Sequence, residues 1–148
     1  MNSKKLLIWL VDDDRDDRFL FKYTIEELQE NVEVVTINSC DEFIRQLYFR
    51  QGALPDIVFL DLNMPRRSGI ECLFELKKEA EFKGIRVVIY STSANPSDIT
   101  KAYKNGADLY VQKPFDIDHL SKVLRKIIDA CRRNEIGQPD ESEFFWGA

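Results

Sequence analysis

Short apolar runs rich in β-branched residues alternate along this chain with segments whose apolar residues follow a helical period. The runs cover residues 6–11, 32–37, 57–60, 85–90 and 109–112. Alternation of this kind predicts a parallel sheet covered by helices on both faces, because parallel strands are joined by helical crossovers. Since such crossovers are almost always right-handed, we expect an α/β fold. Its natural form is a flavodoxin-like, doubly wound sheet of five parallel strands in the order 2-1-3-4-5, with five helices.

The helical segments between the runs differ in how clearly they are marked. They are indicated in turn by Leu20, Phe21, Ile25 and Leu28, by Phe43, Ile44 and Leu47, by Ile70, Leu73, Phe74 and Leu76, by Ser97 to Lys104 after Asn95-Pro96, and by an apolar stripe from Ile117 to Cys131 that Asp116 caps. We therefore expect one domain over residues 1–133.

The pattern stops after residue 132, and residues 134–148 read as an acidic tail that ends in Phe144-Phe145-Trp146. Two interpretations of this tail remain open. It is either a frayed terminus or an aromatic anchor for a partner or for a second copy of the chain in a homodimer. No second domain is expected after it.

Composition excludes several classes of protein. The chain has 148 residues, a net charge of −5, 44% hydrophobic and 32% charged residues, which suits one globular domain and disfavours a nucleic-acid surface. No apolar stretch is long enough to span a bilayer, and residues 1–5 do not begin a signal peptide, so we expect a cytoplasmic protein. The three cysteines, Cys40, Cys72 and Cys131, lie far apart, and we expect them to be unpaired buried residues.

Charged residues follow three of the predicted strands. Asp12-Asp13-Asp14 follows the first, Asp61 follows the third and Lys113 follows the fifth. Open parallel sheets gather their ligands at the carboxyl ends of the strands, so the acids of the first and third strands should converge there. Carboxylates that lie so close repel one another, and a hard divalent cation relieves the repulsion.

These residues predict a Mg²⁺-dependent phosphoryl site. The expected metal ligands are the Asp13 and Asp61 side chains, the Asn63 backbone carbonyl, and Asp12 directly or through water. Asp61 would be the nucleophile that forms an acyl phosphate, with Lys113 and the Ser91 hydroxyl neutralising phosphoryl oxygens.

Simpler interpretations stay open for each of these residues. Asp12-Asp13-Asp14 could cap the following helix, which accounts well for Asp14. Asp61 could be a turn residue before Met64-Pro65, Lys113 a solvated loop residue, and Ser91 part of ordinary turn chemistry.

Taken together, the motifs resemble a response-regulator receiver domain of two-component signalling. The matching residues are Leu10-Val11-Asp12-Asp13-Asp14, Leu60-Asp61-Leu62-Asn63-Met64-Pro65 with Gly69, Ser91, Gly106-Ala107 and Tyr110-Val111-Gln112-Lys113-Pro114-Phe115, over residues 5–131. Within the family, the segment from Ser91 to Asn95 with Asp98-Ile99 and Tyr103 is similar to single-domain receivers that work with phytochrome-type kinases.

The resemblance implies a function and a set of partners. Asp61 would take a phosphoryl group from a sensor histidine kinase or a histidine phosphotransfer protein, with Mg²⁺ as cofactor, and a downstream protein would read the result. Ser91 and Tyr110 would be the switch residues, with Tyr110 moving inward behind Ser91, unless Tyr110 is simply a packed strand residue.

Three departures from the family pattern concern access to the acyl phosphate. Ser91 stands where Thr is more usual, Thr92 stands where many receivers have a smaller residue, and Asn63 and Ser93 occupy variable positions. The lifetime of the phosphorylated state is therefore not set by the motif.

Two other functions are compatible with parts of the pattern. A Mg²⁺-dependent phosphohydrolase of the aspartyl-phosphate type would need a general acid two residues after its nucleophile, where this chain has Asn63. A flavin-binding module would need a Gly-rich phosphate loop and would be repelled by the acids. A receiver that catalyses only its own phosphorylation and dephosphorylation remains the leading hypothesis.

Overall fold

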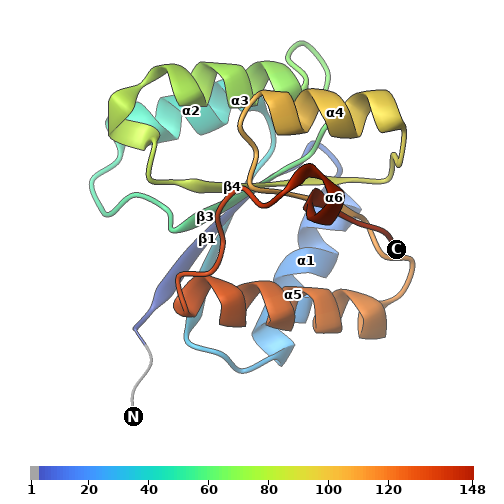
Figure 1. Ribbon diagram of the computed structural model, residues 1–148. Coiled ribbons are helices and arrows are strands. Elements are labelled where there is room, and N and C mark those ends of the chain that lie inside the picture. Colours follow the sequence, from blue (N-terminus) through green and yellow to red (C-terminus); the bar gives the residue numbers. More distant parts are fainter. Residues whose placement is uncertain (1–3) are drawn as a thin grey trace.

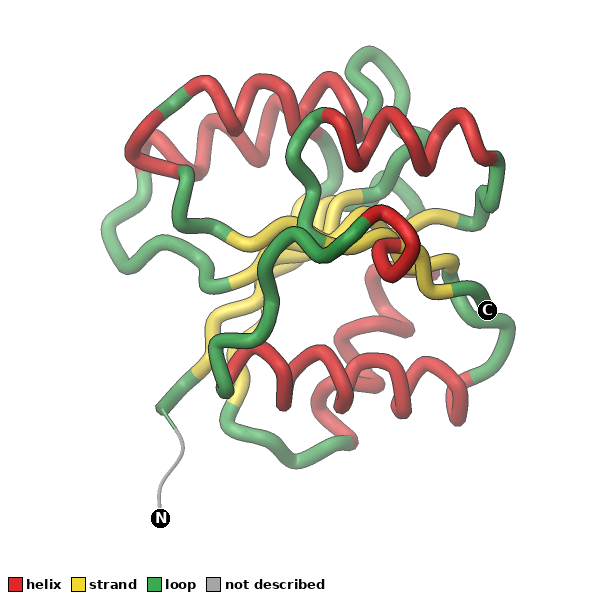
Figure 2. The backbone as a smooth tube through the Cα atoms, viewed as in Figure 1, coloured by secondary structure: helices red, strands yellow, loops and turns green. Residues whose placement is uncertain are grey.

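A parallel sheet lies between two layers of helices (Figures 1 and 2). The structure is a computed structural model in which residues 4–148 are described. The strands lie in the order β2-β1-β3-β4-β5-β6, so the predicted order 2-1-3-4-5 is confirmed. The first three residues of the segment that we judged not to begin a signal peptide lie outside the described residues.

The strands and helices begin and end close to the predicted positions. The strands are β1 (Leu6–Val11), β2 (Val32–Ile37), β3 (Ile57–Leu60), β4 (Arg86–Ser91), β5 (Leu109–Gln112) and β6 (Phe145–Trp146). The helices are α1 (Arg15–Glu27), α2 (Cys40–Phe49), α3 (Gly69–Lys78), the short 3-10 helix η1 (Ala80–Phe82), α4 (Pro96–Lys104), α5 (Ile117–Arg132) and α6 (Glu141–Phe144). Asp116 caps α5 as expected, and Asn95, at the predicted start of α4, caps that helix. Each accepts a hydrogen bond from the first turn.

Two hydrophobic cores lie on opposite faces of the sheet, because successive side chains of a strand point to opposite sides. Alternate residues of β1 illustrate this. Ile8 and Leu10 belong to the core under α1 and α5, whereas Trp9 and Val11 belong to the core under α2, α3 and α4. β3 is buried along its whole length, as a strand covered on both faces should be.

Strand register brings the ends of β1, β3 and β4 to one edge. Val11 pairs with Leu60 and Leu60 pairs with Ile89, so the residues that follow these strands meet there. The start of α3 packs closely against the end of β3, since a Cβ added to Gly69 would collide with the backbone carbonyl of Asp61. The chain therefore requires glycine at position 69 for α3 to approach β3 this closely.

The C-terminal tail is folded onto the domain, so the interpretation of residues 134–148 as a frayed terminus is wrong. It forms α6 and the sixth strand β6, which the predicted five-stranded sheet lacked. β6 pairs in parallel with β5 through Tyr110–Phe145 and Val111–Trp146. Figure 1 shows α6 in dark red at the β5 edge of the sheet. Phe144 is buried in the core.

Two further expectations about single residues were wrong. Cys40 and Cys72 are bonded in a disulfide with 5.7 Å between their Cα atoms, and of the three cysteines only Cys131 is free. Their sequence separation gave no sign of this pairing, because helix packing alone brings α2 and α3 together. Phe74 was expected on the apolar face of its helix, but it is 55% exposed and lies under the ammonium of Lys78.

No helix within residues 4–148 combines the length and the apolar character that a bilayer-spanning segment requires.

Candidate functional site

Three carboxylates converge at the carboxyl edge of the sheet. Asp12 follows β1 and Asp61 follows β3, and the Asp61 N–H donates to the Val11 carbonyl at 2.8 Å. One oxygen from each of Asp12, Asp13 and Asp61 lies within 4.8 Å of the other two, and no other such group of possible metal ligands occurs among residues 4–148. The predicted meeting of acids from two neighbouring strands is therefore present.

Burial makes Asp61 an unusual carboxylate. Its side chain is only 8% exposed. Burial first, and then the charge of Asp12, raises the pKa of Asp61 to about 7, from an ordinary value of 3.8. The acid at this position is therefore costly to ionise even with the Lys113 ammonium nearby, and a further positive charge would favour the carboxylate.

Asp12 is fully buried and both of its oxygens already accept hydrogen bonds. The Asp14 N–H donates to one oxygen at 2.9 Å, and the Lys113 ammonium donates to the other at 2.9 Å. Burial nevertheless raises the pKa of Asp12 above its ordinary value. Asp13, by contrast, is exposed. Asp12 and Asp13 therefore differ in burial and in how far their oxygens are already engaged.

Lys113 is held by more carboxylates than the sequence indicated. Its Nζ lies 2.9 Å from Asp12, 2.7 Å from Asp17 and 3.7 Å from Asp61. Although burial disfavours its charge, the hydrogen bonds to Asp12 and Asp17 hold the pKa of Lys113 above its usual range. Lys113 is therefore not a solvated loop residue.

Asp17 is the residue of the site that sequence reasoning missed. It lies in the first turn of α1, where acids are common because they favour the helix dipole. Its role as a partner of Lys113 depends on where α1 lies relative to the end of β5. Asp14, which the sequence assigned to capping, does cap α1 by accepting hydrogen bonds from the N–H groups of Asp16 and Asp17.

An open cavity of about 670 Å³ gives access to the acids. It is lined by Asp13, Asp14, Arg15, Asp16, Asp17, Asp61, Asn63, Thr92 and Lys113. Asn63 and Thr92 are both exposed at its wall, as expected for residues that border the approach to Asp61. The cavity is therefore strongly acidic, with Lys113 facing Asp61 inside it.

Ser91 and Tyr110 form a chain of contacts behind the site. Ser91 ends β4, is fully buried, and its Oγ accepts a hydrogen bond from the Ser93 N–H at 3.1 Å. Tyr110 is also fully buried, and its hydroxyl donates to the Ser93 carbonyl at 2.9 Å. Both predicted switch residues therefore contact the segment that links β4 to α4.

Comparison with known proteins identifies the family. The family model of the response regulator receiver domain matches residues 8–125, and the chain belongs to this family. The curated relatives include response regulator Rcp1 of Synechocystis sp., 27% identical over 130 residues that cover 85% of this chain and 88% of that protein. Another is the probable methanogenesis regulatory protein FilR2 of Methanothrix harundinacea, 27% identical over 124 residues, which cover 82% of this chain and 80% of that protein.

Solved structures agree with this assignment. The phosphorylated cyanobacterial phytochrome response regulator RcpA superposes with a TM-score of 0.79 and 30% identity, covering 86% of this chain and 94% of that one. The Mn²⁺-bound form of Rcp1 superposes with a TM-score of 0.75 and 25% identity, covering 90% and 99%. The chain is thus a response regulator receiver domain of the two-component type, a class of signalling domains rather than conventional enzymes.

Proposed function

We propose that this receiver accepts a phosphoryl group on Asp61 from the phosphohistidine of a sensor histidine kinase or of a histidine phosphotransfer protein. The observation that carries the proposal is the convergence of Asp12, Asp13 and Asp61 within 4.8 Å, with Lys113 beside them. Phosphoryl transfer needs an in-line nucleophile and charge neutralisation on the phosphoryl oxygens, and this arrangement offers both.

The residues fit a divalent cation, and we propose Mg²⁺. Three carboxylates meet at one point, and the pKa of Asp61 is raised. Both features are expected of a cation site when the positive charge of the cation is absent. Asp13, Asp61 and the Asn63 carbonyl would hold the ion, with Asp12 behind them. A bound divalent ion would supply positive charge that offsets their repulsion and neutralises one phosphoryl oxygen.

The protein's own residues carry out the remaining steps. A carboxylate oxygen of Asp61 attacks the phosphorus, the P–N bond of the phosphohistidine breaks, and the leaving imidazole keeps the electron pair of that bond. Lys113 pairs with a second phosphoryl oxygen, exchanging part of its contact with Asp12 and Asp17. The Ser91 hydroxyl donates to the third oxygen. Hydrolysis by water later releases inorganic phosphate and returns Asp61 to a carboxylate.

The same contacts supply a switch. When Ser91 is drawn to the acyl phosphate, the segment from Ser91 to Ser93 is held with it, and Tyr110 is bonded to the carbonyl at the end of that segment. We propose that the phosphorylated state favours Tyr110 in its inward position. This is a population shift, because the phosphoryl group can favour a conformer only by binding it better.

The output is proposed to be a protein contact. A downstream protein target, rather than nucleic acid or a membrane, would recognise the conformer that phosphorylation favours. Because phosphohistidine is made from ATP, the proposed location is the cytoplasm. RcpA is described as a phytochrome response regulator, which supports a phytochrome-type kinase as the donor for this chain. Rcp1 has been solved with Mn²⁺ bound, which supports a divalent ion as cofactor.

A homodimer, the other expectation for this chain, is tested by light scattering with and without phosphorylation.

The phosphohydrolase alternative gains no support at the site. Asn63 lines the cavity where such an enzyme needs a general acid, and an amide cannot fill that role.

The direct test is intact-protein mass spectrometry after incubation with acetyl phosphate. Wild-type protein with Mg²⁺ is expected to gain one phosphoryl group, and chelation of the metal should prevent the gain. Asp61→Asn should gain none, whereas Asp118→Asn, at an exposed position on α5, should react like the wild type.

Two outcomes would contradict the proposal. Phosphorylation of Asp61→Asn to the wild-type extent would move the acceptor elsewhere, and undiminished phosphorylation after chelation would remove the metal from the reaction. Replacing Mg²⁺ by Mn²⁺ in the same assay tests which divalent ions serve.

A further inference from the structure

The C-terminal tail covers the edge of the sheet at β5, the strand that carries Tyr110. Residues 134–148 run from the end of α5 past α4 and finish alongside β5. Figure 2 shows this segment in front of the sheet, between the two helical layers. The proposed function gives no role to the tail, yet aromatic and hydrogen-bond contacts hold it against α4, β5 and α5.

Phe144 is the anchor of the tail. Its side chain is fully buried, and its ring meets the rings of Tyr103 and Tyr110 edge to face, at centroid distances of 5.1 and 6.3 Å. The neighbouring Phe145 ring lies 5.7 Å from Tyr110. Aromatic pairs of this geometry stabilise beyond the area they bury. Two of the tail's three aromatic residues therefore contact the proposed switch residue.

Polar contacts fix the path of the tail toward this anchor. The Tyr103 hydroxyl donates to the Pro139 carbonyl at 2.9 Å. The Gln138 amide donates to the carbonyls of Tyr103 and Ala107 at 2.7 and 3.0 Å. Since each bond satisfies a particular backbone or side-chain group, the tail has one register on this face.

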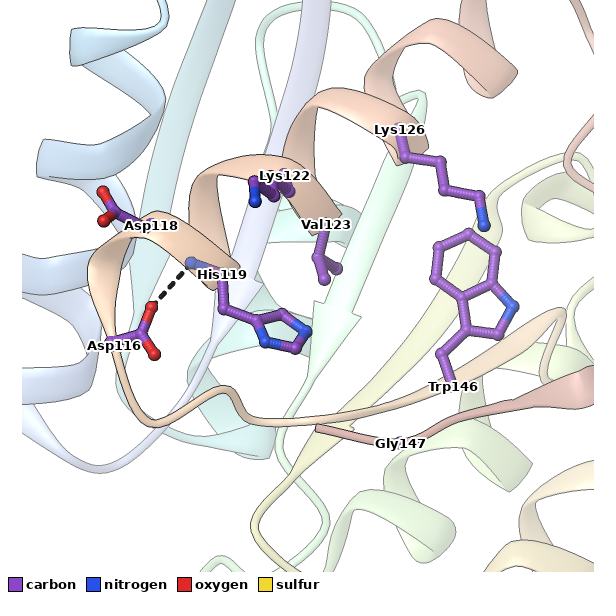
Figure 3. A pocket seen from close by; sticks show the side chains of 8 residues that line it. All are labelled: Asp116, Asp118, His119, Lys122, Val123, Lys126, Trp146 and Gly147. Atoms are coloured by element: carbon purple, nitrogen blue, oxygen red, sulfur yellow. Dashed lines mark hydrogen bonds between the residues drawn. The ribbon is translucent and has the colours of Figure 1, made fainter.

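Trp146 holds the end of the tail against α5. The Lys126 ammonium lies 4.3 Å from the centre of its ring. Figure 3 shows this pair at one end of a groove of about 640 Å³, with His119 and Val123 of α5 along its wall and Gly147 of the tail opposite. The tail therefore bridges α4 and α5 across the edge of β5.

The tail and the acceptor site contact the same short segment. Tyr110, held by Phe144 and Phe145, donates to the Ser93 carbonyl. Gln112 accepts a hydrogen bond from the Ala148 N–H at 3.1 Å and donates to the Thr92 carbonyl at 3.4 Å. Two separate paths thus join the tail to the residues just after Ser91. An event that shifts this segment must change the environment of the tail.

We propose that the tail is an intramolecular ligand of the Tyr110 face, whose docking favours the phosphorylated state of Asp61 and is itself tightened by phosphorylation. This inference rests on the proposed function, in which the acyl phosphate favours the inward Tyr110. With the tail docked, Tyr110 is fully buried and bonded to the Ser93 carbonyl. This is the position that the acyl phosphate is proposed to favour, so the two events select the same conformer. Coupling between binding events is reciprocal, so each must strengthen the other by the same factor.

The experiment uses the full-length chain and beryllium trifluoride with Mg²⁺ as an equilibrium mimic of the phosphoryl group. Binding of the mimic is measured by ¹⁹F NMR titration for wild type, Phe144→Ala and Phe49→Ala. Phe49 is a matched control because it is 75% exposed at the end of α2. We expect Phe144→Ala to bind the mimic about fivefold or more weakly, the usual lower range for coupled sites, and Phe49→Ala to bind as the wild type does.

The reciprocal measurement needs no variant. Hydrogen exchange of the tail amides in wild-type protein should slow by a similar factor, about fivefold, when the mimic is added. Phe145→Ala, which removes the second ring against Tyr110, serves as a second variant if Phe144→Ala does not fold. It should weaken mimic binding in the same direction.

The outcomes separate the two proposals. If the mimic binds and Asp61 is phosphorylated, but tail exchange is unchanged or faster, the coupling is absent or opposite and the inference fails while the function stands. Wild-type affinity for the mimic in both tail variants would overturn it equally. If wild-type protein neither binds the mimic nor gains a phosphoryl group, the proposed function fails and the inference fails with it.

Discussion

Asp61 and Lys113 have opposite charges, and their surroundings affect those charges differently. Burial disfavours the charge of both, but Lys113 has carboxylates around it, whereas Asp61 has another acid as its near neighbour. In the metal-free protein, folding therefore raises the pKa of Asp61 to about 7. The folded state then binds a proton more tightly than the unfolded state does. As a result, the free energy of unfolding falls as the pH rises from about 4 to about 7.

Asp61→Asn should remove this pH dependence. In metal-free buffer at pH 8 we expect the variant to be more stable than wild type by about 1–3 kcal/mol, because the unfavourable buried charge is gone. At pH 4, where wild-type Asp61 is mostly protonated, the difference should nearly vanish. Urea denaturation at the two pH values measures both quantities, and Mg²⁺ should stabilise wild type more than the variant. An equal difference at both pH values would show that the Asp61 charge is not the cause.

Lys113→Met should destabilise the metal-free protein by about 2–4 kcal/mol, because it leaves Asp12 and Asp61 buried without their cation. Urea denaturation in the presence of a chelator measures this loss, and added Mg²⁺ should recover part of it. Lys101→Met, on the exposed side of α4, is the matched control and should change stability by less than about 0.5 kcal/mol. Similar losses in the two variants would mean that Lys113 is not engaged by the acids.

At the scale of elements, α2 and α3 are positioned by their caps and joined by a disulfide. Ser39 caps α2 just before Cys40, and a capping box formed by Ser68 and Glu71 starts α3 just before Cys72. The loop between β3 and α3, which follows Asp61, lies between the two bonded helices in sequence. The guanidinium of Arg67 in this loop lies 4.0 Å from the Cys40 sulfur.

Reduction of the Cys40–Cys72 bond should lower the free energy of unfolding by about 2–4 kcal/mol, because the unfolded chain then regains the freedom of the closed loop. The measurement is urea denaturation with and without a phosphine reductant, in a Cys131→Ser background that leaves only these two cysteines. The double variant Cys40→Ser, Cys72→Ser in that background is the control and should not respond to reductant.

Thiol labelling checks the same bond independently. Unreduced, denatured wild-type protein should take up label at Cys131 alone. Labelling of all three cysteines would mean that the pair is reduced in the protein as purified.

The elements themselves were largely predictable, and the exceptions share a cause. β1, β2, β3 and β5 begin and end at the predicted residues, since their apolar runs are sharply bounded. β4 runs from Arg86 to Ser91, one residue later than predicted at each end. Phe74 fits the apolar period of α3 but is exposed, because no element within residues 4–148 covers that side of the helix. The period of the apolar residues predicts which residues share one face of a helix. It does not predict which face another element covers.

At the scale of the whole molecule, the tail completes the domain. Phe144 enters the core under α2, α3 and α4, while Trp146 packs against the core under α1 and α5. The tail therefore joins the two layers around the edge of the sheet. An acidic segment with three aromatic residues gives no such sign in sequence, because its helix has four residues and its strand has two.

Deletion of residues 141–148 should lower the free energy of unfolding by about 1–3 kcal/mol, because it exposes the apolar surfaces of Tyr103 and Tyr110 that Phe144 covers. Urea denaturation of the full-length and shortened chains measures the loss. The double variant Glu141→Gln, Glu143→Gln changes the charge of the same segment without touching the anchor, and it should stay within about 0.5 kcal/mol of wild type. An unchanged unfolding midpoint after the deletion would mean that the tail does not dock in solution.

The amino-acid pattern by itself determined the first five strands of a parallel sheet and the edge at which Asp12, Asp13 and Asp61 meet. These follow from local periodicity and from one geometric necessity, that neighbouring parallel strands end at the same edge. Only the tertiary structure decided that Asp17 shares Lys113, that Cys40 bonds to Cys72 and that Phe144 packs against Tyr110. Each of these depends on the distance between elements remote in sequence, and such distances are set by how whole helices and the tail pack.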